Sequence, residues 1–397
     1  MPDSPTASGS FLCLARDFKG AATLRALHAL GHRVLLVTDE KNRDEPWPHE
    51  ALADIRYVPP RTHRPHDKQT LVEGTAWMLR EHGVDRIVAL DDFDVEDAAL
   101  LREEFRIPGM GQTTARHFRD KLAMRTRARE AGIDVPAFSD LFNRRHLERF
   151  VGRHAGPYVV KPRSEASADG IRKVADATEA LAAFDDLGER GYEYLIEVFA
   201  PGAVYHVDAL SQDGAVGFAR ASEYAAPPLA IVQGGGLFQT RTLPPDGEVH
   251  RALCALNARV VEAFGLQFSA SHTEFIRDAE GRFLFLETSS RVGGAYISDM
   301  LLHATGVDLW AEWGRLEAAK LAGEAYAMPR DGGGYAAVVL RAVGDEYPDL
   351  SGISDDAIAQ VIHKRYHVGF VLGAERYEGI VAAQERVARW VASYGRG

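Results

Sequence analysis

The chain has 397 residues, of which 46% are hydrophobic and 26% charged, as is typical of a soluble globular protein with two or three domains. Its net charge of −11, from 46 basic and 57 acidic residues, argues against coating nucleic acid or membrane surfaces, since both roles need a basic excess. The sequence shows no signal-peptide pattern and no apolar run of about 18 residues, so we expect a cytoplasmic protein without a membrane or nucleic-acid partner.

The first hundred residues alternate between strand and helix patterns. Residues 11–15, 34–37 and 86–90 form short apolar runs that predict strands, whereas residues 21–30 and 71–81 have helical spacing. This alternation predicts an α/β unit with a parallel sheet.

Two polar segments of this unit could bind a ligand. The first turn, Arg16-Asp17-Phe18-Lys19-Gly20, lacks the G-x-G-x-x-G pattern, which argues against dinucleotide binding. The cluster Asp91-Asp92-Phe93-Asp94 could face a ligand at the carboxyl end of a strand. We favour the alternative that it caps the helix that continues to Phe105.

The middle of the chain places a lysine at the end of a strand. A basic helix is predicted from Thr113 to Gly132, with Asp120-Lys121 in its middle. The strand formers of residues 158–160 then deliver Lys161, which needs an anion because an unpaired ammonium loses too much solvation on burial. The loop 164–170 that follows consists of small residues, so it either wraps a phosphate chain or is a plain hairpin connection.

Glu274 and Glu287 are the most informative pair in the chain. Apolar flanks around a polar turn at residues 277–281 predict an antiparallel hairpin, in which Glu274 faces either Phe285 or Glu287. Either register puts both carboxylates on one face, where they repel unless a hard divalent cation such as magnesium neutralises them. A solvent-facing strand pair with scattered charge is the alternative. In an extended chain, Arg291 would face the same side as Glu287, and its guanidinium could bind a phosphate or carboxylate through two N–H groups.

The order of these segments resembles the ATP-grasp superfamily, within it the carboxylate–amine ligases and notably the L-amino-acid ligases. The matching motifs are Asp120-Lys121, Val160-Lys161-Pro162, Ile196-Glu197, Tyr205-His206-Val207-Asp208, Glu274 and the run from Glu287 through Ser289 and Arg291 to Gly293-Gly294. The resemblance implies a Rossmann-like pre-domain and a two-lobed ATP-grasp domain with antiparallel sheets. We assign residues 1–112 to the pre-domain, 113–205 to the central helices and lid, and 206–397 to the subdomain with the metal and substrate site.

The resemblance also implies roles for individual residues. Its ATP-binding set is Lys121, Lys161 and Ser167 at the phosphates, Glu197 and the Val198 backbone at the adenine, and His206 near the ribose. Its metal set is Glu274, Glu287 and Ser289 around magnesium, with two ions expected. Arg291 and Ser289 form its catalytic set, and Arg291 would bind an acyl phosphate.

Two positions depart from the family pattern. Ser289 stands where the superfamily usually has Asn, and a hydroxyl reaches less far toward a metal. Val204 stands where many relatives place an acidic ribose contact.

The resemblance implies an ATP-dependent ligase that joins a small-molecule carboxylate to an amine, with amino acids as expected substrates and ADP and phosphate as products. The alternatives are an ATP-grasp carboxylase or purine-type ligase, and a nucleotide-binding regulator without turnover. In the C-terminal part, a strand is predicted at residues 335–343 and a helix at 377–394. The mixed run at 362–372 could contact a ligand or a second copy in a homodimer, but we favour solvated strand ends.

Overall fold

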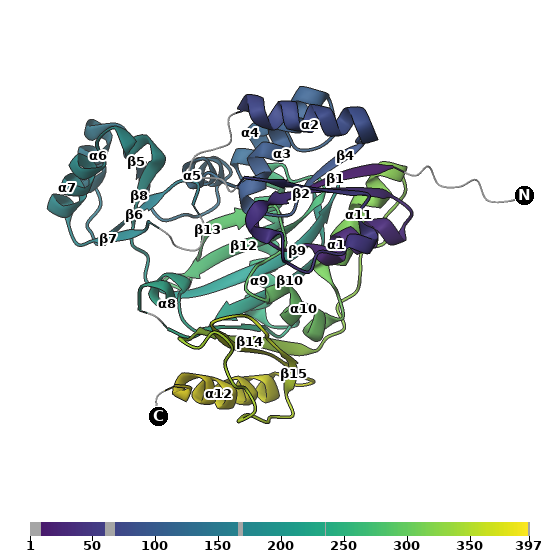
Figure 1. Cartoon of the computed structure of the whole chain (residues 1–397). Helices are drawn as coiled ribbons and strands as arrows, with labels where there is room; N and C mark the ends of the chain where they lie inside the picture. The colour runs from purple at the N-terminus through teal and green to yellow at the C-terminus, as the bar shows by residue number, and fades with distance from the viewer. Residues whose placement is uncertain (1–8, 60–67, 166–169, 235, 396–397) are drawn as a thin grey trace, which may run out of the picture.

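The computed structural model describes residues 9–59, 68–165, 170–234 and 236–395. Its first unit is a parallel sheet with strand order β3-β2-β1-β4 (Figure 1). The strands are β1 (Ser10–Ala15), β2 (Arg33–Asp39), β3 (Asp54–Val58) and β4 (Arg86–Ala89), and the helices that follow them are α1 (Ala21–Ala29), α2 (Lys68–His82) and α3 (Val95–Phe105). The predicted βαβ unit is therefore confirmed. Every residue of β1 is buried, as expected for a strand with neighbours on both sides and helices on its faces.

The predicted helix from Thr113 to Gly132 is wrong in its boundaries. The structure has two helices here, α4 (Gln112–Arg116) and α5 (Lys121–Glu130). Asp120 is the N-cap of α5, because its carboxylate accepts hydrogen bonds from the N–H groups of Leu122 (3.0 Å) and Ala123 (3.4 Å). Lys121 is consequently the first residue of α5 and not a mid-helix residue.

A small antiparallel sheet with strand order β5-β8-β6-β7 forms a separate lobe, at the left of Figure 1. Its strands are β5 (Phe138–Asp140), β6 (Tyr158–Pro162), β7 (Arg172–Val174) and β8 (Tyr194–Val198). Helices α6 (Arg144–Val151) and α7 (Ala177–Leu187) share its apolar core, which includes Leu147, Tyr158 and Ala180. Ser167 lies outside the described residues.

The largest sheet has eight antiparallel strands in the order β13-β12-β9-β10-β11-β14-β16-β15. Their bounds are β9 (Ala203–Gln212), β10 (Ala215–Tyr224), β11 (Phe238–Thr242), β12 (Ser269–Arg277), β13 (Phe283–Ser289), β14 (Tyr335–Ala342), β15 (Ile358–Val361) and β16 (His367–Ala374). The boundary expected at residue 205 falls inside β9, which pairs within the large sheet from Ala203 onward, whereas the small lobe ends with β8 at Val198.

Helices cover this sheet and join it to the first unit. They are α8 (Pro228–Gly234), α9 (Glu248–Phe264), α10 (Ile297–Thr305), α11 (Leu309–Ala322) and α12 (Tyr377–Ser393). Helix α11 packs on α1, and α12 packs on β14 and β16 near the C-terminus (Figure 1). Residues 363–366 are exposed between β15 and β16, whereas residues 368–372 of the same run are buried in β16. Among the described residues, no helix is both long and apolar enough to cross a membrane.

Candidate functional site

A cavity of about 600 Å³ is lined by residues of both antiparallel sheets, α5 and the turn after β4. Its lining includes eight of the ten site residues predicted from the sequence: Lys121, Lys161, Glu197, Val198, Glu274, Glu287, Ser289 and Arg291. A cavity of this size, with apolar walls and a few convergent charges, is typical of a small-molecule site.

The two glutamates of the hairpin face each other. Glu274 pairs directly with Glu287 in the β12–β13 ladder, and a bulge follows Glu274. The Tyr224 hydroxyl donates to Glu274 Oε1 at 2.8 Å, and Lys121 Nζ lies 3.1 Å from Glu287 Oε2. Burial alone would raise the pKa of Glu287, but Lys121 and Lys161 lower it to about 2. Glu287 is therefore anionic at neutral pH, and the opposed carboxylates provide the hard oxygen ligands that magnesium prefers.

Lys161 obtains the anion that its position at the end of β6 required. Its Nζ lies 2.7 Å from Glu197 Oε2, and Arg125 Nε lies 2.5 Å from Glu197 Oε1. Burial lowers the pKa of Lys161, and Glu197 partly opposes that shift. Glu197 thus fixes two cations beside the cavity. The Val198 N–H already donates to Ala137 O at 2.8 Å, so this group is not free for an adenine.

Arg125 was not predicted. It is fully buried on α5, and its Nη1 also donates to the Leu286 carbonyl, next to Glu287. Arg125 therefore ties α5 to β8 and β13 at the site. Its position four residues after Lys121 puts both side chains on one helix face, which is the only signal that the sequence offered.

Arg291 reaches across to the first unit. Strand β13 ends at Ser289, so an extended chain does not position Arg291 as the parity argument assumed. Its Nε donates to Asp92 Oδ2 at 2.8 Å, its Nη2 donates to the same oxygen, and its Nη1 donates to Val292 O at 2.9 Å. Burial alone would raise the pKa of Asp92, but Arg291 and Arg119 hold it well below the usual range.

The acidic cluster after β4 serves both roles that the sequence left open. Asp91 caps the short 3₁₀ turn at Asp92–Asp94, because it accepts from the Phe93 N–H at 2.9 Å. Asp91 also pairs with Lys19 at 2.5 Å. Both Asp91 and Asp92 line the cavity, so the favoured cap holds for Asp91 together with a ligand-facing position and was wrong for Asp92. The carboxyl end of a parallel strand was the signal for Asp92.

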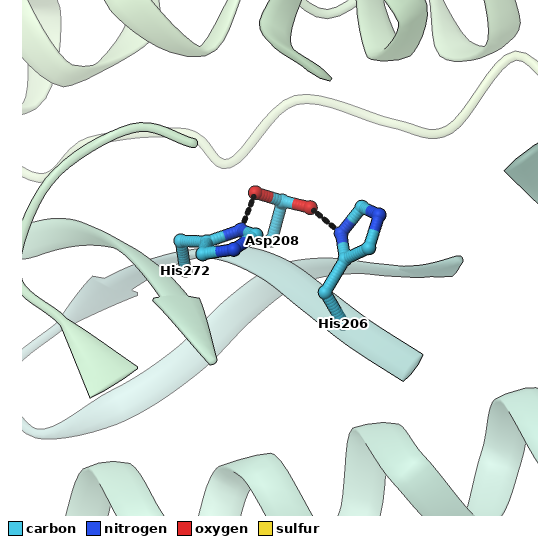
Figure 2. A group of neighbouring side chains, drawn as sticks. All are labelled: His206, Asp208 and His272. Atoms are coloured by element: carbon cyan, nitrogen blue, oxygen red, sulfur yellow. Dashed lines mark hydrogen bonds and ion pairs between the residues drawn. The ribbon is translucent and has the colours of Figure 1, made fainter. Parts of the chain in front are cut away.

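His206 does not line the cavity. It is fully buried, and its Nδ1 lies 2.6 Å from Asp208 Oδ2 (Figure 2). Its Nε2 lies 2.7 Å from Thr240 Oγ1. These contacts give no support to the expected ribose contact. His272, which was not predicted, does line the cavity. Burial alone would lower the pKa of His272, but Asp208 raises it to about 9.

Comparisons with solved structures cover nearly the whole chain. The L-amino acid ligase from Bacillus licheniformis superposes with a TM-score of 0.76, 17% identity and 98% coverage of both chains. The N5-carboxyaminoimidazole ribonucleotide synthetase from Thermus thermophilus superposes with a TM-score of 0.71, 18% identity and coverage of 97% and 99%. The chain has the ATP-grasp fold. The fold predicted from the ordered motifs is thereby confirmed.

Sequence comparison finds more partial matches. No family model matches the chain. An L-arginine-specific L-amino acid ligase of Bacillus subtilis is 26% identical over 242 residues, which are 59% of this chain but only 57% of that ligase. A D-alanine–D-alanine ligase of Aromatoleum aromaticum is 28% identical over 253 residues, covering 59% of this chain and 78% of that enzyme.

Proposed function

We propose that this ATP-grasp protein is an ATP-dependent carboxylate–amine ligase. The observation that carries the proposal is the direct pairing of Glu274 and Glu287 in a cavity that also holds Lys121, Lys161 and Arg291. Opposed carboxylates suit divalent cations, and the nearby cations suit the phosphates of a nucleotide. The similarity to L-amino acid and D-alanine–D-alanine ligases supports the same activity.

The residues of the cavity fit ATP with magnesium. Glu274 and Glu287 would hold the metal, and Ser289 could add a hydroxyl ligand, which makes two ions feasible. When bound, magnesium would offset the charge that develops on the phosphates during transfer. Lys121 and Lys161 would contact phosphate oxygens. Apolar lining residues, including Val159 and Leu286, would form walls for the base.

The proposed reaction has two steps. A substrate carboxylate oxygen attacks the γ-phosphorus of ATP, and the bond from that phosphorus to the β-phosphate oxygen breaks. The products of this step are ADP and an acyl phosphate. An amine then attacks the acyl carbon, the bond from that carbon to the phosphate oxygen breaks, and phosphate leaves, while the nitrogen gives up a proton to water. Arg291 has five N–H groups, and three of them donate to Asp92 and Val292, so two remain for the anionic intermediate.

Amino acids are the proposed substrates, because the relatives act on amino acids. The test is phosphate release from ATP and Mg²⁺ over a panel of amino acids, given singly and in pairs. We expect release that depends on both an acid and an amine, with one amide formed for each phosphate released. ATP binding without ADP formation across the panel would contradict the proposal and favour a non-catalytic regulator.

A carboxylase or purine-type ligase is the second candidate. The similarity to N5-carboxyaminoimidazole ribonucleotide synthetase and to a biotin carboxylase (TM-score 0.70, 14% identity) favours it. Bicarbonate distinguishes the two candidates. Phosphate release that requires bicarbonate and no amino acid would favour a carboxylase.

A further inference from the structure

A chain of polar contacts runs behind the cavity and ends on Glu274. His206 Nδ1 and His272 Nδ1 bond to opposite oxygens of Asp208, at 2.6 and 2.8 Å (Figure 2). Because Asp208 occupies Nδ1 of His272, the other ring nitrogen is the one left for the cavity side. That nitrogen, Nε2, lies 3.6 Å from Glu274 Oε1. The Tyr224 hydroxyl donates to the same oxygen at 2.8 Å.

The three residues His206, Asp208 and His272 could in principle ligate a metal themselves, since their ligand atoms lie within 4.8 Å of one another. Their geometry argues against it. The carboxylate lies between the two rings, and each of its oxygens is already within hydrogen-bond distance of one Nδ1 (Figure 2). A cation would have to break both hydrogen bonds beside the fully buried side chains of His206 and Asp208. The cluster is therefore a satisfied hydrogen-bond chain and not a vacant donor set.

The loop that carries Arg291 packs directly on this chain. A Cβ on Gly293 would lie 2.6 Å from Asp208 Oδ1 and 3.0 Å from His272 Nδ1, which is closer than side-chain carbons approach such atoms. Gly293 thus lets the backbone pass over the hydrogen bond between Asp208 and His272. The hydrogen bond between Asp208 and His272 therefore lies against the Arg291 loop, and it also holds the His272 ring that faces Glu274.

We propose that His272 is a positioning residue that fixes the Glu274 carboxylate for its cation, anchored from behind by Asp208 and His206. Tyr224 and His272 both approach Oε1, which leaves Oε2 to face the metal. Outer partners of this kind orient a ligand, and their loss typically weakens metal binding or activity by about 10- to 100-fold. The inference rests on the proposed function, because it takes Glu274 as a metal ligand.

If the polar contacts only stabilise the fold, their loss should not change how strongly Mg²⁺ enhances nucleotide binding. Metal-dependent nucleotide binding therefore distinguishes a positioning role of His272 from a purely structural one. The probe is ADP, and its dissociation constant is measured by calorimetry with and without Mg²⁺ on the full chain. The ratio of the two constants reports the metal's contribution and needs no turnover.

His272→Gln keeps a polar group near Asp208 but removes the nitrogen that faces Glu274. We expect the Mg²⁺-dependent gain in ADP affinity to fall by about 10-fold or more, with metal-free ADP affinity little changed. Tyr224→Phe, which keeps the ring and removes only the donor to Oε1, should lower the same gain even if His272→Gln does not fold. Thr273→Val is the matched control, because Thr273 Oγ1 bonds to Thr288 Oγ1 at 2.8 Å on the opposite face of the same hairpin.

The control should lose thermal stability and keep the full Mg²⁺-dependent gain. If His272→Gln and Tyr224→Phe also keep that gain, the positioning role is refuted while the proposed function stands. If the wild-type protein itself shows no Mg²⁺-dependent gain in ADP affinity, the metal assignment of the proposed function fails, and this inference fails with it.

Discussion

Replacing Arg291 with lysine separates a catalytic role from a structural one. The guanidinium spans Asp92 and the Val292 carbonyl at once, whereas a lysine ammonium could keep the pairing with Asp92 but not the fork. Because both side chains are largely buried, the lost charge-assisted hydrogen bonds should lower the unfolding free energy by about 1–3 kcal/mol. In a chain of this length, that loss corresponds to a fall in Tm of a few degrees.

The expected kinetic effect is larger. If two N–H groups of Arg291 contact the transferred phosphoryl group, their loss removes stabilisation that is made mainly in the transition state. Removing one such donor typically costs about 2.7–4 kcal/mol, or about 10²- to 10³-fold in kcat. The dissociation constant for ATP should stay within about a few-fold, because the lysine keeps the charge.

The assay pairs Arg291→Lys with Asp92→Asn, and measures Tm, kcat and the ATP dissociation constant for both. Asp92→Asn weakens the same ion pair by removing the carboxylate charge but keeps the Arg291 guanidinium. Its Tm should therefore fall by a similar amount, while its kcat should fall less. The catalytic reasoning is refuted if both variants lose the same Tm and both keep kcat within about 3-fold of wild type. Arg291 would then serve only to hold its loop against the first unit.

Three further predictions concern the charged lining. Glu287→Gln should lower turnover by about 10²-fold or more while circular dichroism shows a retained fold, and unchanged activity would contradict the metal assignment. Lys161→Ala should weaken ATP binding more strongly at low salt than at high salt, and calorimetry at two ionic strengths checks this. The pKa of Glu197 is lowered, since burial would raise it but Arg125 and Lys161 outweigh burial. The stability from this carboxylate is therefore present above its ordinary pKa of 4.5 and is lost as pH falls below that value. Denaturant unfolding of wild type and Glu197→Gln should differ by about 3–5 kcal/mol at pH 7 and converge in acid, and a constant difference would contradict the assignment.

The sequence was most informative where local pattern and chemistry coincide. The β12–β13 hairpin could be predicted because alternation, a polar turn and two carboxylates all lie within a short segment. The sequence left open whether Glu274 pairs with Phe285 or with Glu287. The register depends on the bulge after Glu274, and the turn residues do not predict that bulge. The order of the ATP-grasp motifs then indicated the fold, and five of the six motifs contribute residues to one cavity.

Contacts between distant segments could not be predicted. Asp92 and Arg291 are 199 positions apart, and Arg125 meets the Leu286 carbonyl across 161 positions. Both contacts depend on how separate units pack and not on any local periodicity. The ribose contact of His206 was implied by the resemblance alone, and no local pattern of the sequence shows which neighbouring strands cover this side chain. In the structure, the His206 ring contacts Thr240 of β11 and Tyr224 of β10, and His206 does not line the cavity.

The ion pairs of the cavity suggest how it would accept the proposed nucleotide. Lys121 is paired with Glu287, and Lys161 with Glu197, so each of these lysines has a carboxylate partner in the cavity. A divalent cation at Glu287 would replace Lys121 as its partner and free that ammonium for a phosphate oxygen. Metal-free ATP offers no such exchange, because its phosphates would meet the Glu287 charge directly. The arrangement would therefore favour nucleotide and metal entering together, and it accounts for a lysine that lies 3.1 Å from the carboxylate proposed to bind the metal.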